Sequence, residues 1–412
     1  MADVLLGLAC VASIPVDLPS GSEGRPEDRP ADAYEATVEE VTGPADLDHD
    51  DSWIFSLDVV HELDVTIDDA GWASLSADPY TEVPARLTFD GVELSEPIGI
   101  RVKGRLGSYR SLSQKTAFKL DLDEYADQHL EGLRRLNLNN QVQDHAKTHE
   151  ITAYSLYRAA GVGAPRVAYA WLRVNGADFG VYSLVEAYEE RFLEQWYDDA
   201  EGNFYDGDYV LWDDGSYTQL DFDSSLHHLF ELDEGVDVGL ADIYAVTEAR
   251  EIGAANGTYA STITSVIDLD QFLRFWALEM WTGQYDGYVY NRNNFRVYFD
   301  PDDGLAHFHP WDHDWAFYDT VPIQSPWGLL AANCKSDDVC HARFLQILDE
   351  ISLVADTTPL TEQSHAAFAL IEPYLAVDPR LEVSLDTIRS YQDHLDGWLA
   401  SRSAALAART DL

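Results

Sequence analysis

The chain has 412 residues, of which 46% are hydrophobic and 12% aromatic, so it carries ample material for a large core and global disorder is excluded. Its 74 acidic and 26 basic residues give a formal net charge of −48. Such an acidic surface repels phosphate backbones and anionic lipids. The composition therefore argues against a nucleic-acid-binding protein and against electrostatic docking on membranes.

The first 50 residues are expected to lie outside the folded part. Val4–Val11 is an apolar run that is too short to span a bilayer and lacks the basic start of a full signal peptide. Cys10 follows Leu8-Ala9, as at the end of a lipoprotein signal, so we expect export and lipidation of Cys10; an ordinary apolar N-terminus is the alternative. The Pro-, Gly- and acid-rich residues 15–50 predict a flexible acidic tether.

Cys334 and Cys340 bracket a short polar stretch and can close a small disulfide, which persists only in an oxidising compartment. Two free thiols are the alternative. No Cys-x-x-Cys motif accompanies them, so a cysteine-bound zinc site is not expected.

From Phe55 onward, alternating hydrophobicity predicts strands joined by tight turns. A helix is expected over His145–Ala160, with Asp144 as N-cap and Gly161 after its end. The predicted strands cover residues 59–67, 85–94, 98–104, 116–122, 167–174 and 179–186.

From Ala187 the pattern changes to helices, including one over residues 268–285 that is apolar nearly all round and is therefore predicted to be buried. Residues 198–225 read as loop. Further helices are expected at 189–197, 342–351, 362–371 and 385–407, and strands at 295–299 and 305–311. We therefore predict an α+β fold in which a β-rich part, residues 51–186, precedes a mainly helical part, residues 187–412.

Acidic residues occur at both ends of the second predicted hairpin. Asp286 lies on the loop that leads into it, and Asp312 and Asp314 lie on the loop that leads out. This geometry can bring Asp286, an Asn amide and one of the later acids to one point. Carboxylate and amide oxygens suit Mg²⁺, Mn²⁺ or Ca²⁺ better than zinc. The alternatives are a structural turn at Asp286 and a calcium loop or helix cap at residues 311–315.

The order of these residues resembles the catalytic half of a protein kinase, in which a loop Asp is followed by a metal-binding Asn and, after a hairpin, by a metal-binding Asp. Asn291 lies five residues after Asp286, the offset of the kinase loop. A strand lysine, Lys115 or Lys119, precedes a helix glutamate, Glu150, like the kinase lysine–glutamate pair. The usual HRD, DFG and GxGxxG motifs are absent, and residues 103–108 give only a weak glycine signal.

A local basic run stands out in this acidic chain and could hold phosphates. The alternative is that these bases merely pair with neighbouring acids. The run consists of Arg101, Lys103, Arg105, Arg110, Lys115 and Lys119.

Six stretches together resemble the spore-coat protein H (CotH) kinase family, an atypical kinase-like group often found in exported bacterial proteins. The resemblance extends over about residues 53–405, and the order and spacing of the stretches are more specific than any one of them. They cover residues 100–122, 133–162, 171–193, 285–298, 308–317 and 395–406.

The resemblance implies a two-lobed, atypical protein-kinase-like fold, with a β-rich N-lobe, a mainly helical C-lobe and ATP in the cleft. Asp286 matches the catalytic aspartate and Asp312 the metal-binding one, with Asp314 as its rival. The metal would be Mg²⁺ or Mn²⁺, with Ca²⁺ as an alternative. The other implied site residues are Asn291 or Asn294 for the metal (Asn293 is a third choice), Lys119 or Lys115 for phosphate, Glu150 to hold that lysine, Arg105 and Ser108 at the glycine turn, and Glu186, whose neighbouring backbone would face the adenine.

These observations predict an exported kinase, in the cell envelope or outside the cell, that transfers the γ-phosphate of ATP to Ser or Thr hydroxyls of a secreted or surface protein. The acidic surface favours a basic acceptor. A non-catalytic, acidic surface or coat lipoprotein that binds Ca²⁺ or a protein partner is one alternative, and a nucleotidyl transferase that uses the same cleft is another. His307, His309 and His313 leave zinc as a minor alternative, and Asp206-Gly207-Asp208 reads as a solvated turn.

Overall fold

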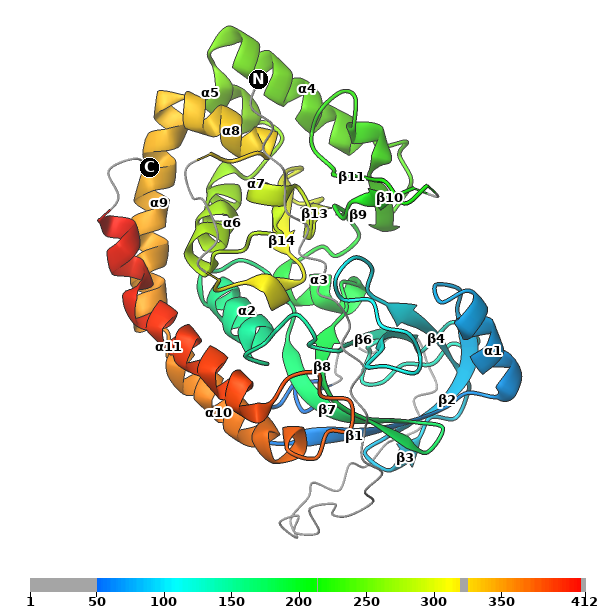
Figure 1. Ribbon diagram of the computed structural model, residues 1–412. Coiled ribbons are helices and arrows are strands. Elements are labelled where there is room, and N and C mark those ends of the chain that lie inside the picture. The colour runs from blue at the N-terminus through cyan, green and yellow to red at the C-terminus, as the bar shows by residue number, and fades with distance from the viewer. Residues whose placement is uncertain (1–49, 213, 319–324, 409–412) are drawn as a thin grey trace. The chain divides into compact units, whose positions relative to one another are not determined.

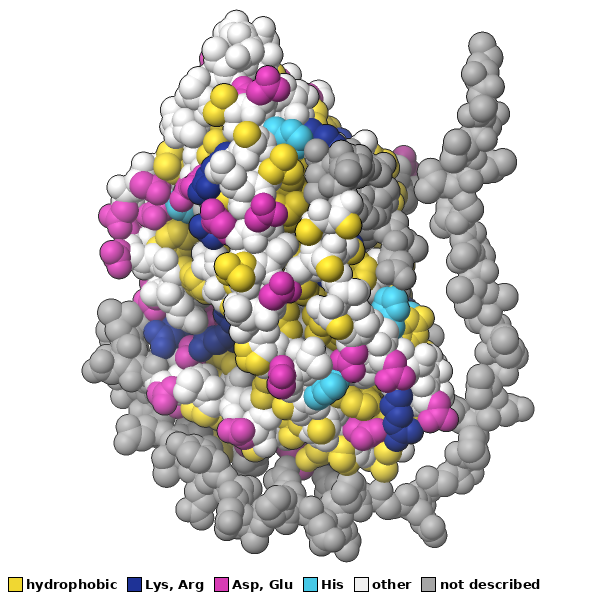
Figure 2. Space-filling view, turned by 90° about the vertical axis from the view of Figure 1, so that its left-hand side faces the viewer, with side chains coloured by type: hydrophobic (Ala, Val, Ile, Leu, Met, Phe, Trp, Pro, Cys, Tyr) yellow, Lys and Arg dark blue, Asp and Glu magenta, His cyan; other side chains and the backbone are white. Residues whose placement is uncertain are grey.

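The computed structural model describes residues 50–212, 214–318 and 325–408, all of which belong to one compact unit. The expected lipidation site Cys10 and the acidic tether up to residue 49 lie outside the described residues. Within the described ranges no helix is both long enough and apolar enough to cross a membrane. Figure 2 shows one face of the molecule, where acidic side chains are spread among apolar ones and basic side chains gather at few places.

Seven strands close into a barrel in the order β1-β7-β8-β6-β5-β4-β2, because β2 pairs with β1 (Figure 1). The short strand β3 extends the sheet beside β2. All neighbouring pairs are antiparallel except β1 with β7. The strands are β1 (Val60–Thr66), β2 (Val83–Phe89), β3 (Val92–Glu93), β4 (Ile98–Lys103), β5 (Ala117–Asp121), β6 (Arg135–Asn139), β7 (Val167–Val174) and β8 (Ala177–Glu186).

Side chains along each strand alternate between the two faces of the sheet, so the interior of the barrel is hydrophobic and the exterior of β4, β5 and β6 is polar. Val102, Phe118 and Leu138 are among the fully buried residues that fill the interior. The register places Arg101 opposite Lys119, and Lys119 opposite Asn137. The outer face of these strands is therefore a polar strip, which continues to Lys103 and Asn139 one pleat further along.

The helices form a second hydrophobic cluster, which also covers the outer face of β7 and β8. Figure 1 shows α9, α10 and α11 following one another along one side, with α10 against β8 and α2. The helices are α1 (Asp69–Ala77), α2 (His149–Ala159), α3 (Glu190–Trp196), α4 (Ala241–Asn256), α5 (Tyr259–Ile263), α6 (Leu269–Thr282), α7 (Tyr288–Asn291), α8 (Leu329–Ser336), α9 (Asp338–Thr357), α10 (Leu360–Leu375) and α11 (Leu385–Ala407).

A second, four-stranded sheet in the order β12-β9-β13-β14 accompanies the helices, and β10 and β11 make a separate small hairpin. Two single turns of 3₁₀ helix complete the description, at His227–Leu229 and His313–Trp315. The strands are β9 (Asn203–Asp206), β10 (Val210–Leu211), β11 (Tyr217–Thr218), β12 (Glu231–Glu234), β13 (Phe295–Phe299) and β14 (Ala306–Pro310).

The mixed α+β class is confirmed, and most predicted strands and helices are present, but several elements differ from the sequence prediction. The prediction missed α1, α4, α5, α7, α8, β6 and β12, and it took residues 198–225 as mostly loop, although β9, β10 and β11 lie there. In β6 the outward residues are Arg135, Asn137 and Asn139, so the strand lacks the composition of an ordinary β segment. Helix α2 begins at His149, because Asp144 accepts from the backbone of Lys147 and His149 and shapes a loop rather than a cap.

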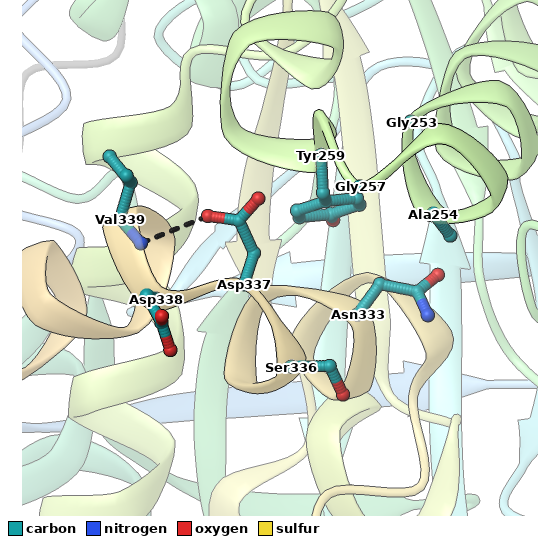
Figure 3. A pocket seen from close by; sticks show the side chains of 9 residues that line it. All are labelled: Gly253, Ala254, Gly257, Tyr259, Asn333, Ser336, Asp337, Asp338 and Val339. Atoms are coloured by element: carbon teal, nitrogen blue, oxygen red, sulfur yellow. Dashed lines mark hydrogen bonds between the residues drawn. The ribbon is translucent and has the colours of Figure 1, made fainter.

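The predicted disulfide is confirmed: Cys334 and Cys340 are bonded, with Cα atoms 5.1 Å apart. They do not bracket a loop, because Cys334 lies in the last turn of α8 and Cys340 in the first turn of α9. A cavity of about 370 Å³ opens beside this corner (Figure 3). Asp337 on its wall caps α9 by accepting from the amides of Val339 and Cys340. None of the predicted nucleotide or metal residues lines this cavity.

Candidate active site

Asp286 lies on the turn between α6 and α7, and buried hydrogen bonds fix this turn. The carboxylate of Glu279, in the last turns of α6, accepts from the amides of Tyr288 and Val289 at 2.8 Å each. Asp286 itself accepts from the side-chain amides of Asn291 and, at 3.0 Å, Asn294. Two amides thus hold the two oxygens of one carboxylate.

A chain of side chains fixes the orientation of the Asn291 amide. Arg292 donates to Gln219 Oε1, and Gln219 Nε2 donates to Asn291 Oδ1 at 2.7 Å. This hydrogen-bonded series has a guanidinium (Arg292), which only donates, at one end and a carboxylate (Asp286), which only accepts, at the other. Asn291 must therefore point its side-chain nitrogen at Asp286. Its oxygen is therefore occupied. Asn294 also gives its nitrogen to Asp286, and no described residue donates to its oxygen.

Asp312 reaches the same place from the other strand of the hairpin. Phe295 pairs with Pro310, so Asn294 and Trp311 are the next residues outward, and Trp311 N donates to Asn294 O at 3.0 Å. The side chain of Gln284 donates to the carbonyl of Asp312 at 2.8 Å. The hairpin therefore brings the predicted acid loops together, as the sequence indicated.

Asp208 joins this cluster, although the sequence analysis took it for a solvated turn. Strand β9 pairs with β13 so that Asp206 lies opposite Arg296, and Arg296 forms ion pairs with Asp206 at 2.8 Å and with Asp208 at 3.2 Å. The turn after β9 therefore ends beside Asp286 and Asp312. Only the pairing of strands that are distant in the sequence reveals this residue.

The carboxyl groups of the site raise one another's pKa. Burial, followed by the charges of Asp312 and Asp208, raises the pKa of Asp286 to about 6, against the opposing effect of the Asn amides. Burial and then Asp208 raise the pKa of Asp312. Burial, Asp312 and Glu150 raise the pKa of Asp314 well above its ordinary range. Buried acids that lie this close together are chemically suited to a hard divalent metal ion.

The cation beside Glu150 is Lys103. Its Nζ donates to Asn139 Oδ1 at 2.5 Å, and Asn139 Nδ2 donates to Glu150 Oε1 at 2.6 Å. The ammonium group also lies 5.0 Å from the centre of the Trp311 ring, next to Asp312. The other oxygen of Glu150 is buried without a hydrogen bond. Lys103, from the end of β4, therefore connects the barrel, α2 and the acidic loops.

The two lysines that the sequence favoured lie elsewhere, so the expected pair with Glu150 is not formed. Lys115 is buried and forms an ion pair with Asp378 at 2.5 Å. Lys119 is on the polar strip one pleat from Lys103, and no hydrogen bond or ion pair of its ammonium group is found among the described residues. Burial, and then Arg101 and Arg135, lower its pKa. Strand parity alone puts Lys103 and Lys119 on one face, and it does not say which of them reaches α2.

The glycine turn lies over the acidic loops. Tyr209 directly follows Asp208 in the chain. Arg105 donates to the carbonyl of Tyr209, and Leu106 N lies 3.4 Å from its hydroxyl. The carbonyl of Ser108 accepts from Asn140 at 3.0 Å. Arg105 thus contacts the residue that follows Asp208, whereas Ser108 contacts Asn140.

Glu186 ends β8 and is almost fully buried. Its carboxylate accepts from the Arg166 guanidinium at 2.5 Å and from Gln195 at 2.8 Å, so the side chain holds the junction together. Its role near a nucleotide would fall to the backbone that follows it.

The three histidines do not converge into a zinc site. His309 contacts Tyr197 and Gly163, His313 contacts Tyr157, and His307 contacts Asp303. Each ring has its own protein partner, because His307 and His309 both lie on β14 but His313 follows the turn at Asp312.

Several non-glycine residues around the cluster have left-handed backbones. Asn294 has φ 51° and Asp312 has φ 47°, and Arg292 and Phe317 are similar. Asn and Asp tolerate this region better than other residues, whereas Arg and Phe are strained there. Such strain concentrates at functional sites, where the surroundings enforce it.

Two sequence comparisons found proteins that are similar to this chain. A family profile described as "CotH kinase protein" matches residues 100–406, more than half of the chain. The inner spore coat protein H of Bacillus subtilis (strain 168) is 23% identical over 301 residues, which cover 68% of this chain and 80% of that protein.

Two solved structures show weaker similarity. One is HipA from the Shewanella oneidensis MR-1 toxin–antitoxin complex with HipB and its operator DNA, with 13% identity, 82% and 79% coverage and a TM-score of 0.35. The other is the Golgi casein kinase, with 11% identity, 83% and 78% coverage and a TM-score of 0.27. TM-scores this low do not establish a common fold.

Proposed function

Because the chain belongs to the CotH kinase protein family, we propose that it is an exported, ATP-dependent protein kinase that transfers the γ-phosphate to Ser or Thr hydroxyls. One observation carries the proposal. The carboxylate of Asp286 is held by two amides and lies within electrostatic reach of Asp312 and Asp208. Lys103, over the ring of Trp311, connects to Glu150 through Asn139. Phosphoryl transfer asks a protein for this combination of an acceptor-orienting acid, metal-binding acids and a phosphate-binding cation.

In this proposal Asp286 orients the acceptor hydroxyl and accepts its proton. The hydrogen bonds from Asn291 and Asn294 keep its two oxygens in place, so little reorganisation is needed during the reaction. Asn291 is then a positioning residue, because its own oxygen is taken by Gln219.

Mg²⁺ or Mn²⁺ would fit the remaining oxygen ligands. Asp312, Asp208 and the free side-chain oxygen of Asn294 would hold it, and Asp314 would add charge from the same loop. When bound, the metal ion supplies positive charge to the phosphate oxygens. The raised pKa values of Asp312 and Asp314 support this assignment, because a divalent cation relieves such crowding.

Lys103 is the first choice for the lysine that neutralises phosphate charge, since Asn139 and Glu150 hold it beside the acids. Lys119 stays a nucleotide-binding candidate, one pleat away on the same strip. Arg105 and Ser108 on the glycine turn would cover the phosphates. Lys115 is committed to Asp378 and is assigned a different role below.

We further propose that residues 51–186 and 187–412 act as the two lobes of a kinase, with the nucleotide between the polar strip and the acidic loops. The backbone after Glu186 would then face the adenine. The net charge of −48 favours a basic acceptor protein.

The name of the Bacillus relative supports a coat or envelope location for this chain as well. The Cys334–Cys340 disulfide fits an oxidising compartment. Export and lipidation of Cys10 belong to the same proposal, and an intact-mass measurement of the protein from its native host tests the lipid.

The decisive experiment supplies ATP labelled on either the α or the γ phosphate, with Mg²⁺ or Mn²⁺ and a basic Ser-containing protein. Transfer of γ label that is lost in Asp286→Asn supports the kinase. The Asn variant keeps the size of the side chain and is expected still to bind nucleotide. Transfer of α label instead would identify a nucleotidyl transferase. A folded protein that binds no nucleotide would contradict both and favour a non-catalytic coat protein.

A further inference from the structure

The segment between β4 and β5, residues 104–116, contains the glycine turn of the candidate site, with Gly104 and Gly107, and is here called the glycine-rich loop. A tight hairpin needs only two to five residues, so this loop is long and has no regular structure of its own. Its conformation must therefore be set by contacts with the rest of the molecule. The tip at Arg105–Gly107 is exposed; it contacts Tyr209, as described above, and Gly107 lies close to the Gln143 side chain.

The base of the loop is held by one short segment from the far end of the chain. Residues 378–382, here called the clamp, lie in the connection between α10 and α11. Arg110 donates to both oxygens of Glu382, at 2.6 and 2.8 Å. Arg380 donates to the carbonyls of Leu112 and Gln114. Lys115 and Asp378 form the ion pair at 2.5 Å, in which both side chains are almost fully buried.

Each of the two segments contributes charged side chains that bind groups of the other segment. The loop contributes two cations to the clamp acids, and the clamp contributes one cation to the loop carbonyls. A buried ion pair such as Lys115–Asp378 leaves an uncompensated charge when either partner is removed. The two segments are thus expected to dock and separate as a unit.

The barrel provides a formed receptor for the clamp on β8. The amide of Val181 donates to Asp378 at 3.0 Å, and the Arg380 guanidinium lies 3.3 Å from the centre of the Phe179 ring. Between them, Gly180 has φ +94°, and a Cβ there would lie 2.0 Å from the Asp378 carboxylate. Only glycine leaves room for Asp378 at this position.

The loop also connects directly to the candidate catalytic groups. Asn140 donates to the carbonyls of Ser108 at 3.0 Å and Lys115 at 2.8 Å, which ties the two sides of the loop together. Asn140 directly follows Asn139, the partner of Lys103. If the base of the loop shifts, Asn140 is expected to move the tip of the loop with it. The same shift would also move Asn139, the partner of Lys103.

We propose that the clamp positions the glycine-rich loop for ATP, so that the α10–α11 connection, far from the chemistry in sequence, sets the affinity of the nucleotide site. Asp378, Arg380 and Glu382 are positioning residues, because they act on the nucleotide through the loop. The inference rests on the proposed kinase function of the same site.

The test uses the more exposed pair, Arg110 and Glu382, because its loss should not unfold the protein. The full chain is prepared as wild type, Arg110→Glu, Glu382→Arg and the double charge swap. Arg343→Glu is the matched control, because Arg343 also makes a two-pronged ion pair, with Asp270 at 2.6 and 2.9 Å, away from the loop. Each protein is assayed for KM and kcat with ATP and for amide hydrogen exchange of residues 104–116 without nucleotide.

Each single variant is expected to raise KM for ATP about 3- to 20-fold, with kcat changed less, and to speed exchange in the loop. The charge swap should restore both to within about twofold, and Arg343→Glu should leave both unchanged. Unchanged KM in the single variants, or no rescue by the swap, would overturn the inference. An inactive wild type would instead overturn the proposed function, and the exchange data alone would then decide whether the clamp holds the loop.

Discussion

Lys103 Nζ lies 2.5 Å from the side-chain oxygen of Asn139, and this amide in turn donates to Glu150. Protein kinases pair a strand lysine directly with a helix glutamate. Here β6, the strand that directly precedes α2, contributes an amide, and the lysine comes from β4. The Asn139 amide thus bridges the Lys103 ammonium group and the buried Glu150 carboxyl group through two hydrogen bonds.

Replacing Lys103 should damage nucleotide use more than replacing any other lysine of the basic run. Lys103→Ala is expected to lower kcat/KM for ATP about 100-fold, because the phosphate charge loses its positioned counter-charge. Lys119→Ala is the matched control from the same face of the sheet and should cost about tenfold or less. Steady-state kinetics on both variants decide the assignment, and a larger loss at Lys119 would reverse it.

Removing the connecting amide should destabilise the fold. Asn139→Leu leaves the buried Glu150 carboxyl without its donor, which costs about 1–3 kcal/mol of unfolding free energy in urea titrations. Adding Glu150→Leu removes the orphaned group as well. The double variant should therefore lose less than the sum of the single losses, and strict additivity would mean that the two side chains do not act together.

The two asparagines that hold Asp286 should differ in metal dependence. Asn294 has a free oxygen, so Asn294→Ala is expected to raise the Mn²⁺ concentration for half-maximal activity about tenfold. Asn291 is occupied at both ends, so Asn291→Ala should lower kcat but leave that concentration within about twofold. Mn²⁺ titrations of both variants at saturating ATP test the difference. Equal shifts would make both residues ligands.

His309 should make the protein less stable in mild acid. Burial lowers its pKa to about 3, from an ordinary 6.5, and outweighs the opposing effect of the hydrogen bond with the Gly163 carbonyl. Between these values the unfolded chain binds a proton that the native protein does not, so stability is full above pH 6.5 and falls as the pH drops below it. From pH 7.5 to 5.5 this contribution is about 1.4 kcal/mol.

His309→Gln removes the titrating ring and should lower this pH dependence by that amount. Urea unfolding of both proteins at the two pH values measures the difference. Parallel curves for wild type and variant would show that His309 does not titrate as described.

The disulfide should contribute stability but no catalysis. It closes a loop of sequence separation 6, for which chain entropy predicts about 2 kcal/mol. The double variant Cys334→Ala/Cys340→Ala should unfold at correspondingly lower urea concentration and keep its KM for ATP, because the bond joins α8 to α9 away from the acidic loops. A change in KM would connect this corner to the nucleotide site.

The amino-acid sequence by itself determined the features that depend on neighbours along the chain. Asp286 and Asp312 flank the two ends of one predicted β-hairpin, so the sequence predicted that they lie close together. The short spacing of Cys334 and Cys340 predicted their disulfide bond. Family membership also follows from the sequence, because several motifs recur in order. Strand parity predicted that Lys115 and Lys119 share one face, but Lys115 precedes β5 and its partner is Asp378.

Only the tertiary structure decided which of those residues meet. The pairing of β4, β5 and β6 brings Lys103, rather than Lys119, to Asn139 and through it to Glu150, and no periodicity encodes that choice. Asp208 enters the site because β9 pairs with β13 across a long stretch of chain, and Lys115 leaves it because Asp378, 263 residues later, neutralises it. These are long-range contacts of buried charges, whose energies depend on partners that local sequence patterns do not contain.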